Sequence, residues 1–360
     1  MKQLFITFII ACCISNHAIA QDKMCLPAGT TPNSIAFNAA EINQYLGFEK
    51  YKAVFYGEQH NSNFDPEIKY HLITDLHQHY GFRHVFMEIG FSESYLYNRY
   101  LRTGDTTLLS HPRLIFTSVY YLQFWNRLYM YNKSLPDDKK IIIHGIDFER
   151  TDVYKAISLL APAGKPVPEP LKPVMDTIAA HLEDNPLRMY AEKDGKLSGL
   201  VDNTSFKKRL KYLQSEFLTH TAISQDFFGS NYAILESIIH NKSEVTVRPK
   251  PRNKTMFENM KQTIASEKTD KFIVFLGGSH LQYQQSSSLV NRVKDLPGMA
   301  AKNMLNIVEA VYNIKALREN KDADRLKTMN DGCRATIFPA TTVPGYETWA
   351  DFVIIADNQE

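Results

Sequence analysis

The sequence is 360 residues long, enough for one large domain or two domains of ordinary size. Hydrophobic residues make up 44% of it and charged residues 22%, a mixture typical of a soluble globular protein. This composition excludes a disordered chain, a collagen-like repeat and a coiled-coil rod. Lys and Arg total 41 against 39 Asp and Glu, so the net charge is only +2 and we expect no nucleic-acid partner.

The first twenty residues have the pattern of a secretory signal. A short basic start precedes an apolar run from Leu4 to Cys13, and Ala18-Ile19-Ala20 offers small residues for a signal peptidase. The run is too short to span a bilayer, which needs about 20 residues. We expect residues 1–20 to be cleaved and the protein to be exported, to the periplasm or the medium. The alternatives are a buried N-terminal helix and a lipoprotein leader that anchors the chain through Cys12.

Helical and strand patterns alternate along the mature chain. The predicted helices occupy residues 33–48, 66–80, 93–102 and 119–132. The predicted strands are short and apolar, at residues 52–56, 84–88, 141–144, 272–276, 305–308 and 352–356. Such alternation predicts an α/β fold with a largely parallel central sheet flanked by helices. The aromatic stretch 119–131 either lines an apolar cleft or packs in the core with Trp125 buried, and core packing is favoured.

The middle of the chain departs from this alternation. Residues 151–243 contain several helical patterns and no convincing strand. We therefore expect a helical insertion subdomain at residues 151–250, which divides the α/β domain into halves at 21–150 and 251–360. After the helical patterns, residues 246–255 combine two prolines with four basic residues, a composition typical of an exposed loop.

Two cysteines remain after the expected signal, Cys25 and Cys333, near opposite ends of the mature chain. In an oxidising compartment such a pair often forms a disulfide, but two unpaired buried thiols fit the sequence equally well. Neither cysteine lies in a nucleophile motif, so we expect no catalytic role for them.

Titratable side chains follow the predicted strands, beside glycines. They are Glu58 with His60, Glu88, Asp147 with His144 behind it, and His280. In an open α/β sheet the ligand crevice lies beyond the carboxyl ends of the strands, so these side chains are expected to meet there. Glycine permits tight turns and close approach of the backbone to a ligand. The pattern therefore predicts a functional site at this edge of the sheet.

These residue types support two kinds of chemistry. A histidine next to a carboxylate can deprotonate water, and two Glu with two His can also hold a divalent metal ion. The candidate metal ligands are Glu58, His60, Glu88 and His280. Spacing does not decide between the two, because the H-E-x-x-H metalloprotease motif is absent. No G-x-S-x-G elbow, P-loop or G-x-G-x-x-G motif occurs either.

Several short segments, taken in their order along the chain, can be compared with the motifs of a known family. They are Gly57-Glu58-Gln59-His60-Asn61, the strand 80–88, the helix 95–100, His144-Gly145-Ile146-Asp147, the segment 252–259, Phe275-Leu276-Gly277-Gly278-Ser279-His280 and the strand 351–357. Over about residues 50–357 this order resembles the erythromycin esterase-like and haem-uptake, Tiki- and ChaN-like superfamily. The resemblance implies an α/β hydrolase in which a histidine activates water against an ester carbonyl.

Carried over to this sequence, the resemblance assigns His60 as the general base. It implies that Glu58 and Glu88 orient the histidine and the water, and that His280 stabilises the oxyanion or protonates the leaving group. Contacts with a small-molecule substrate are expected from Asp147, Arg252 and His144. The alternative for Arg252 is an exposed side chain in a basic loop. No cofactor is required under this interpretation, although a divalent metal or haem is possible.

Two departures from the esterase pattern leave the substrate open. Erythromycin esterases usually have two residues between the first Glu and His, but only Gln59 intervenes here, as in the haem-uptake branch. Their late strand usually carries two histidines three residues apart, and Gly277 stands where the first would fall. The sequence therefore also allows a haem- or iron-complex-binding protein, or a Tiki-like metal-dependent peptidase.

Overall fold

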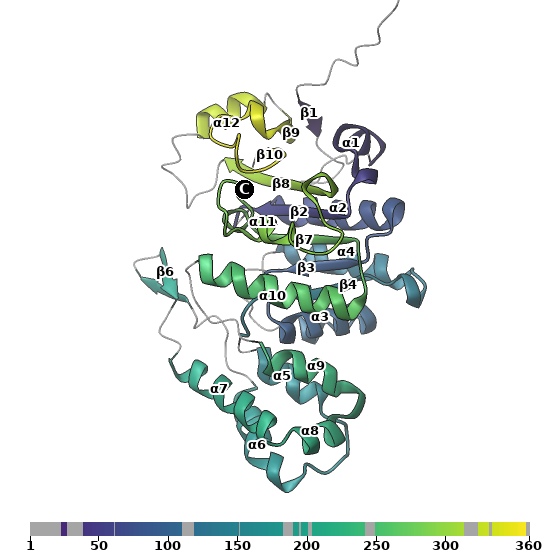
Figure 1. The fold of residues 1–360 in the computed structure, drawn as a ribbon, viewed down its shortest axis with the longest axis vertical. Coiled ribbons are helices and arrows are strands. Elements are labelled where there is room, and N and C mark those ends of the chain that lie inside the picture. The colour runs from purple at the N-terminus through teal and green to yellow at the C-terminus, as the bar shows by residue number, and fades with distance from the viewer. Residues whose placement is uncertain are drawn as a thin grey trace, which may run out of the picture.

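The computed structural model has the α/β architecture that the sequence predicts (Figure 1). The structure describes residues 23–26, 39–60, 62–109, 119–150, 152–182, 190–193, 196–200, 204–241, 249–312, 323–330 and 333–357. The expected signal, including Cys12, lies outside the described residues. None of the described helices is long and apolar enough to cross a membrane.

The central sheet has the strand order β1-β9-β10-β8-β2-β7-β3-β4. Its parallel strands are β2 (Ala53–Glu58), β3 (His84–Met87), β4 (Ile142–Gly145), β7 (Phe272–Gly277), β8 (Met304–Tyr312) and β10 (Phe352–Asp357). Two short antiparallel strands complete one edge, β9 (Ala335–Pro339) beside β10 and β1 (Met24–Leu26) beside β9. The prediction of a largely parallel sheet is confirmed, although β1 and β9 were not predicted.

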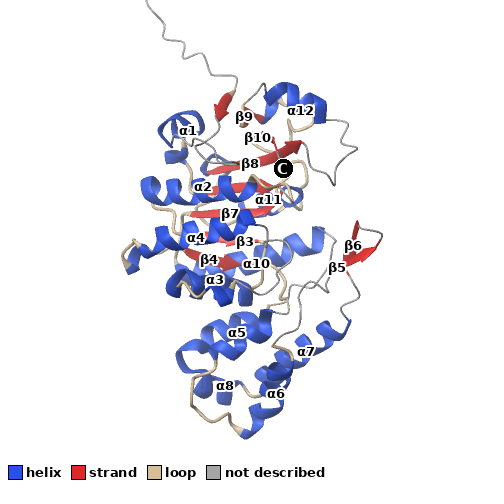
Figure 2. Ribbon diagram, turned by 180° about the vertical axis from the view of Figure 1, so that it is seen from behind, coloured by secondary structure: helices blue, strands red, loops and turns tan. Residues whose placement is uncertain are grey.

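The two faces of the sheet pack on different helices, because side chains alternate along each strand. Val54 and Ile273 belong to one core, with α2 (Asp65–Tyr80), α3 (Phe91–Thr103) and α4 (Val119–Lys133). Phe55 and Val274 belong to the opposite core, with α10 (Pro249–Glu267) and α11 (Leu289–Val293). Figures 1 and 2 show these helical layers from the two sides of the sheet. The remaining helices of the α/β part are α1 (Ala39–Leu46) and α12 (Ala323–Asn330).

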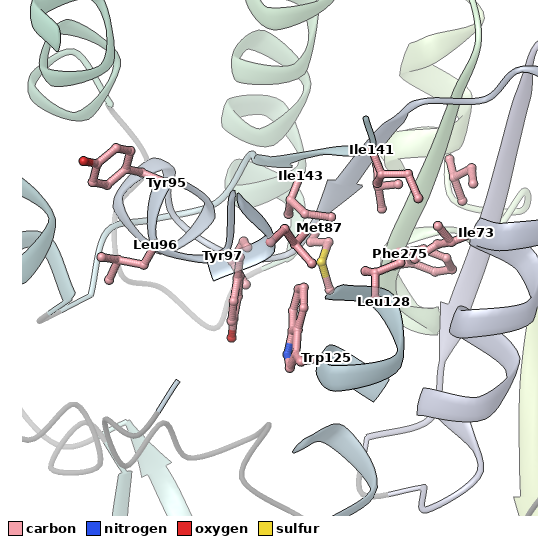
Figure 3. Packing of buried hydrophobic residues seen from close by; sticks show 14 of the residues in the cluster. Ile73, Met87, Tyr95, Leu96, Tyr97, Trp125, Leu128, Ile141, Ile143 and Phe275 are labelled. Atoms are coloured by element: carbon pink, nitrogen blue, oxygen red, sulfur yellow. The ribbon is translucent and has the colours of Figure 1, made fainter. Parts of the chain in front are cut away.

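The aromatic helix α4 contributes to the core. Trp125 is buried and stacks on Tyr97 of α3, with ring centroids 4.0 Å apart and an interplanar angle of 16°. Figure 3 shows this pair next to Met87 of β3 and Leu128 of α4. Core packing is thus the role of Trp125, rather than the lining of a substrate cleft.

The described residues between 152 and 241 are mainly helical, and their helices lie beyond the β4 edge of the sheet (Figure 1). The helices are α5 (Asp152–Leu160), α6 (Lys172–Ala180), α7 (Thr204–Thr219), α8 (Thr221–Phe228) and α9 (Tyr232–Ile239), and both α5 and α9 pack against α3. The expectation of no strand here was wrong, because β5 (Tyr190–Lys193) and β6 (Lys196–Leu200) form an antiparallel pair. The boundaries of a separate subdomain stay a prediction.

The stretch 246–255 is not simply an exposed loop, because α10 begins at Pro249 within it. Proline is well tolerated in the first turn of a helix, where its missing N–H has no intrahelical partner. The sequence analysis took the two prolines as part of a loop and missed this role. As a result, Arg252 lies in the first turn of α10 rather than in a loop.

A disulfide joins Cys25 of β1 to Cys333, which precedes β9, across a sequence separation of 308 residues. It resolves the choice between a bridge and free thiols, and it is compatible with export. The bridge fixes the N-terminal strand to the edge of the sheet where β1 pairs only with β9.

Removing this bridge should destabilise the protein. In the chain-entropy model, a closed loop of this length stabilises the folded state by about 5 kcal/mol through the unfolded ensemble. We expect a Cys25→Ser/Cys333→Ser variant to unfold at a clearly lower urea concentration than the oxidised protein. An unchanged urea midpoint would show that the bridge contributes nothing to stability.

Candidate functional site

The predicted site residues come to one edge of the sheet because the strands that carry them are parallel. Glu58 ends β2, Glu88 follows β3, Asp147 follows β4, and His280 ends the short 3-10 helix η7 (Gly278–His280) after β7. Arg252 reaches the same edge from the first turn of α10. Of the side chains predicted from the sequence, only His144 is not brought to this group.

Glu58 and His60 form a hydrogen-bonded pair at the end of β2. Nδ1 of His60 lies 2.9 Å from Oε1 of Glu58. The glutamate is buried, with 7% of its side chain exposed, whereas 54% of the His60 side chain is exposed. The hydrogen bond to Glu58 raises the pKa of His60 to about 9, against the opposing effect of burial. With Nδ1 engaged, Nε2 is the ring nitrogen left to act on a bound molecule.

A buried lysine, Lys69, forms an ion pair with the glutamate of this pair. Nζ of Lys69, on α2, contacts Oε2 of Glu58 and lies 2.8 Å from Oδ2 of Asp65. It also donates a 3.2 Å hydrogen bond to the hydroxyl of Tyr121, which in turn donates to Asp65. Burial would lower the pKa of Lys69, but the carboxylates of Asp65 and Glu58 outweigh it and raise that pKa. The ammonium therefore stays charged, and with His60 it keeps the pKa of Glu58 low despite burial.

Glu309 extends this cluster from the neighbouring strand β8. Its carboxyl accepts a 2.7 Å hydrogen bond from the Ser62 hydroxyl and a 3.0 Å bond from the amide of Gln59. Burial, together with the nearby Asp65, raises the pKa of Glu309 to about 8, so it carries a proton at neutral pH. Its bonds fix the segment on either side of His60, because Gln59 and Ser62 flank that residue.

A second cluster surrounds Glu88. Nη2 of Arg252 lies 2.5 Å from Oε1 of Glu88 and 2.5 Å from Oδ2 of Asp147, and Nε of Arg252 donates a 3.0 Å bond to Oδ1 of Asp147. Such two-pronged guanidinium–carboxylate pairing fixes both geometry and charge. Burial would raise the pKa of Glu88, but Arg252, His280 and His60 hold it well below its usual range. Glu88 is therefore an anion in the site.

His280 completes this cluster. Its Nδ1 lies 2.5 Å from the side-chain oxygen of Asn253, whose amide nitrogen is fixed by a 3.0 Å bond to the carbonyl of Ser287. The other ring nitrogen, Nε2, lies 3.6 Å from Oε1 of Glu88 and 3.5 Å from Nη1 of Arg252. Because Nδ1 faces an acceptor, it carries the proton, and Nε2 points toward the charged groups of the site.

The two clusters meet at Gly277, the last residue of β7. Gly277 pairs with Glu58 in the register of β2 and β7, and its amide donates a 2.7 Å hydrogen bond to Oε2 of Glu88. His60 and Glu88 therefore both lie next to Gly277, which has no side chain.

His144 lies elsewhere, within β4 rather than at the end of that strand. Its Nε2 is 2.9 Å from Nδ1 of His84, and its ring stacks on Phe86. Burial lowers the pKa of His144 to about 3 and that of His84 to about 4, so both are neutral and one donates to the other. The contacts of His144 are those of a core residue.

Some residues of the site escaped the sequence analysis. Lys69 and Asp65 are spaced i, i+4 on α2, a pattern that usually marks an exposed ion pair rather than a buried one. Glu309 carried a clearer signal, because a carboxylate in the apolar run 304–312 must be either paired or protonated. Asn253 carried none, because its role depends on the position of α10.

The metal-ligand alternative gains no support from the geometry. Within the described ranges, no three His, Cys, Asp or Glu side chains converge in a way that could hold a metal ion. The candidate ligands of the sequence analysis instead bond to Lys69, Arg252 and Asn253.

Solved structures with the same fold exist, although no protein-family model and no curated protein matches the chain. A protein from Bacillus cereus is 14% identical, with 92% of this chain and 95% of that chain covered and a TM-score of 0.58. The erythromycin esterase EreC, in its open conformation, is 12% identical, with 93% and 97% covered and a TM-score of 0.55. A succinoglycan biosynthesis protein is 12% identical, with 94% and 95% covered and a TM-score of 0.58. The fold is thus erythromycin esterase-like, which confirms the resemblance at the level of the fold.

Loss of the buried lysine should destabilise the protein strongly. In Lys69→Met, Glu58 and Asp65 lose their buried counter-ion, and removing one partner of such a pair typically costs about 3–5 kcal/mol. The matched control is Lys52→Met, which removes an exposed ion pair with Asp270 and should change the unfolding free energy by less than about 1 kcal/mol. Equal effects of the two variants in urea unfolding would contradict the importance of the buried cluster.

Proposed function

We propose that the protein is an exported hydrolase that acts on an ester or a related carbonyl substrate with water activated by His60. The observation that carries the proposal is the Glu58–His60 pair, in which a buried carboxylate holds Nδ1 and Nε2 is left to act. A histidine oriented in this way by a carboxylate is a standard arrangement for general-base catalysis. The erythromycin esterase-like fold supports the reaction class by analogy.

The proposed step begins with neutral His60. Its Nε2 takes a proton from a water molecule while Glu58 stabilises the imidazolium that forms. The water oxygen bonds to the carbonyl carbon, the C–O double bond opens, and a tetrahedral oxyanion results. When that intermediate collapses, the carbonyl reforms, the bond to the leaving oxygen breaks, and the proton on His60 passes to that oxygen.

The second cluster would stabilise the charge that develops in this step. Arg252 lies next to Glu88 at the same edge of the sheet, where its fixed guanidinium charge can stabilise an oxyanion without reorganisation, and His280 lies beside both groups. Glu88, an anion, would accept a hydrogen bond from the attacking water and orient it. Asp147 would hold Arg252 in place rather than contact the substrate, and His144 has no part in the proposal. No cofactor is required for this step.

Export fits the features of both ends of the mature chain. The expected signal at residues 1–20 precedes Cys25, and the Cys25–Cys333 disulfide needs an oxidising compartment to persist. We therefore place the hydrolase outside the cytoplasm, with a small-molecule substrate.

Replacing His60 should abolish turnover without unfolding the protein. On a panel of small esters, His60→Gln is expected to lower kcat by about 10²- to 10⁴-fold, the usual contribution of general acid–base catalysis. The matched control is His71→Gln, which breaks another His–Glu pair, 3.0 Å long, on α2. Turnover that survives in His60→Gln would disprove the mechanism.

The same assay distinguishes the alternatives. Metal analysis and a chelator arm would reveal a metal hydrolase, because removal of a stoichiometric metal would then abolish turnover. A Soret band on mixing with haemin, without ester turnover, would instead favour a haem-binding protein. Chelator-resistant turnover that depends on His60 would support the proposal.

The pH dependence should identify the base. Only neutral His60 can accept a proton, so kcat/KM should rise with pH and level off above the His60 pKa of about 9. Glu58→Gln removes the hydrogen-bonded charge that raises this pKa, so the midpoint should move down toward the ordinary histidine value of about 6.5. A profile flat between pH 5 and 9 in the unmodified protein, or an unmoved midpoint in Glu58→Gln, would count against His60 as the base.

A further inference from the structure

Gly277 lies between the two halves of the site. Strand β7 runs between β2 and β3 in the sheet, so its last residue stands between the strand ends that carry His60 and Glu88. The amide of Gly277 already holds Oε2 of Glu88 at 2.7 Å. Its Cα faces the His60 ring, which extends from β2 two residues beyond Glu58, the register partner of Gly277.

A side chain at residue 277 would crowd the His60 ring and would touch Glu88. A Cβ placed there would lie 3.0 Å from Nε2 of His60, 3.2 Å from its Cε1 and 3.4 Å from Oε2 of Glu88. The two distances to His60 are tighter than nine in ten contacts that real Cβ atoms make, whereas the distance to Glu88 is at the limit of an ordinary contact. Glu88 is fixed by Arg252 and by backbone, whereas His60 is half-exposed, so the imidazole is the group that would have to move.

Backbone conformation does not require glycine at this position. Gly277 has φ −55° and ψ 136°, which any L-residue can adopt. Gly81 offers a contrast, because it ends α2 with φ 74°, in the left-handed region that favours glycine. Glycine at the end of a buried strand weakens the strand and commonly marks a close approach to that backbone. Space for the His60 ring is therefore the reason for glycine at residue 277.

We propose that Gly277 is a positioning residue for His60. The absence of a side chain lets the imidazole lie against the end of β7, keep its hydrogen bond with Glu58 and turn Nε2 toward Glu88. The catalytic consequence of this placement rests on the proposed function, whereas the placement itself does not.

The test compares Gly277→Ala with Gly278→Ala. The two glycines are adjacent, but a Cβ on Gly278 would meet nothing closer than the carbonyl oxygen of Glu58 at 3.7 Å, an ordinary contact. Gly278→Ala is therefore a matched control for an added methyl group at the same edge of the sheet. Gly277→Ser provides a second variant that adds a Cβ at the critical position.

The first measurement is the pKa of His60 by NMR titration of the imidazole signals, assigned with the help of His60→Gln. In Gly277→Ala and Gly277→Ser the displaced ring loses its close bond with Glu58, so its pKa should fall by at least one unit. In Gly278→Ala it should stay at the value of the unmodified protein. The second measurement is ester turnover, for which kcat should fall at least tenfold in both Gly277 variants with little change in KM.

The third measurement is the melting temperature, which separates positioning from a structural role. Because alanine can adopt the backbone angles of residue 277 and only the half-exposed His60 ring has to move, Gly277→Ala should melt close to the temperature of the unmodified protein. A large drop in melting temperature would overturn the proposal, since glycine would then be needed for the fold itself. A His60 pKa unchanged in Gly277→Ala, or shifted equally in Gly278→Ala, would also overturn it. If the unmodified protein hydrolyses no ester but the His60 pKa falls only in the Gly277 variants, the positioning role stands and the proposed function fails.

Discussion

The ion pair between Lys69 and Glu58 is the contact on which the rest of the site depends. Both charges are buried, and a buried charge is tolerated only when a partner and hydrogen bonds replace the water it has lost. Asp65 and Tyr121 supply the remaining partners of the ammonium, so its position is set from several sides. Glu58 is consequently held as a carboxylate at the end of β2. That fixed carboxylate in turn determines the orientation of His60 and which ring nitrogen faces the site.

The two carboxylates at the strand ends, Glu58 and Glu88, are made different by their surroundings. Glu58 pairs with the buried Lys69 and the half-exposed His60. Glu88 instead accepts hydrogen bonds from Arg252 and from the backbone amide of Gly277. Because of the first arrangement, the pKa of His60 is raised to about 9 and its imidazole is mostly protonated at neutral pH. The resting site therefore presents an imidazolium beside an anionic Glu88. A base of this kind is strong once it is deprotonated, but it works best in alkaline conditions or after a substrate has lowered its pKa.

The sequence predicted the parallel strands and most of the site, because both depend on local patterns. An apolar strand followed by glycine and a titratable residue places that residue at the carboxyl edge of a parallel sheet, which located Glu58, Glu88 and His280. The prediction that His144 contacts the substrate was wrong, because this residue lies within β4, where its contacts are with His84 and Phe86. Lys69, Asn253 and Glu309 could not be placed, because their roles follow from how α2, α10 and β8 pack. The edge strand β1, with three residues, is too short for a periodic pattern to appear.

The two departures from the esterase pattern concern the same place in this structure, the space between His60 and Gly277. A single residue separates Glu58 from His60, and the His60 ring lies at the end of β7, next to Gly277. In the pattern that the sequence resembles, a histidine stands at this position of the late strand. A side chain of any size there would occupy the place of the His60 ring, since even a Cβ would lie 3.0 Å from its Nε2. Glycine at residue 277 therefore leaves room for the His60 ring in this chain. His60 takes the space beside Glu88 that a side chain at residue 277 would otherwise fill, whereas His280, which follows β7, lies 3.6 Å from the same carboxylate, so the two histidines reach Glu88 from different strands.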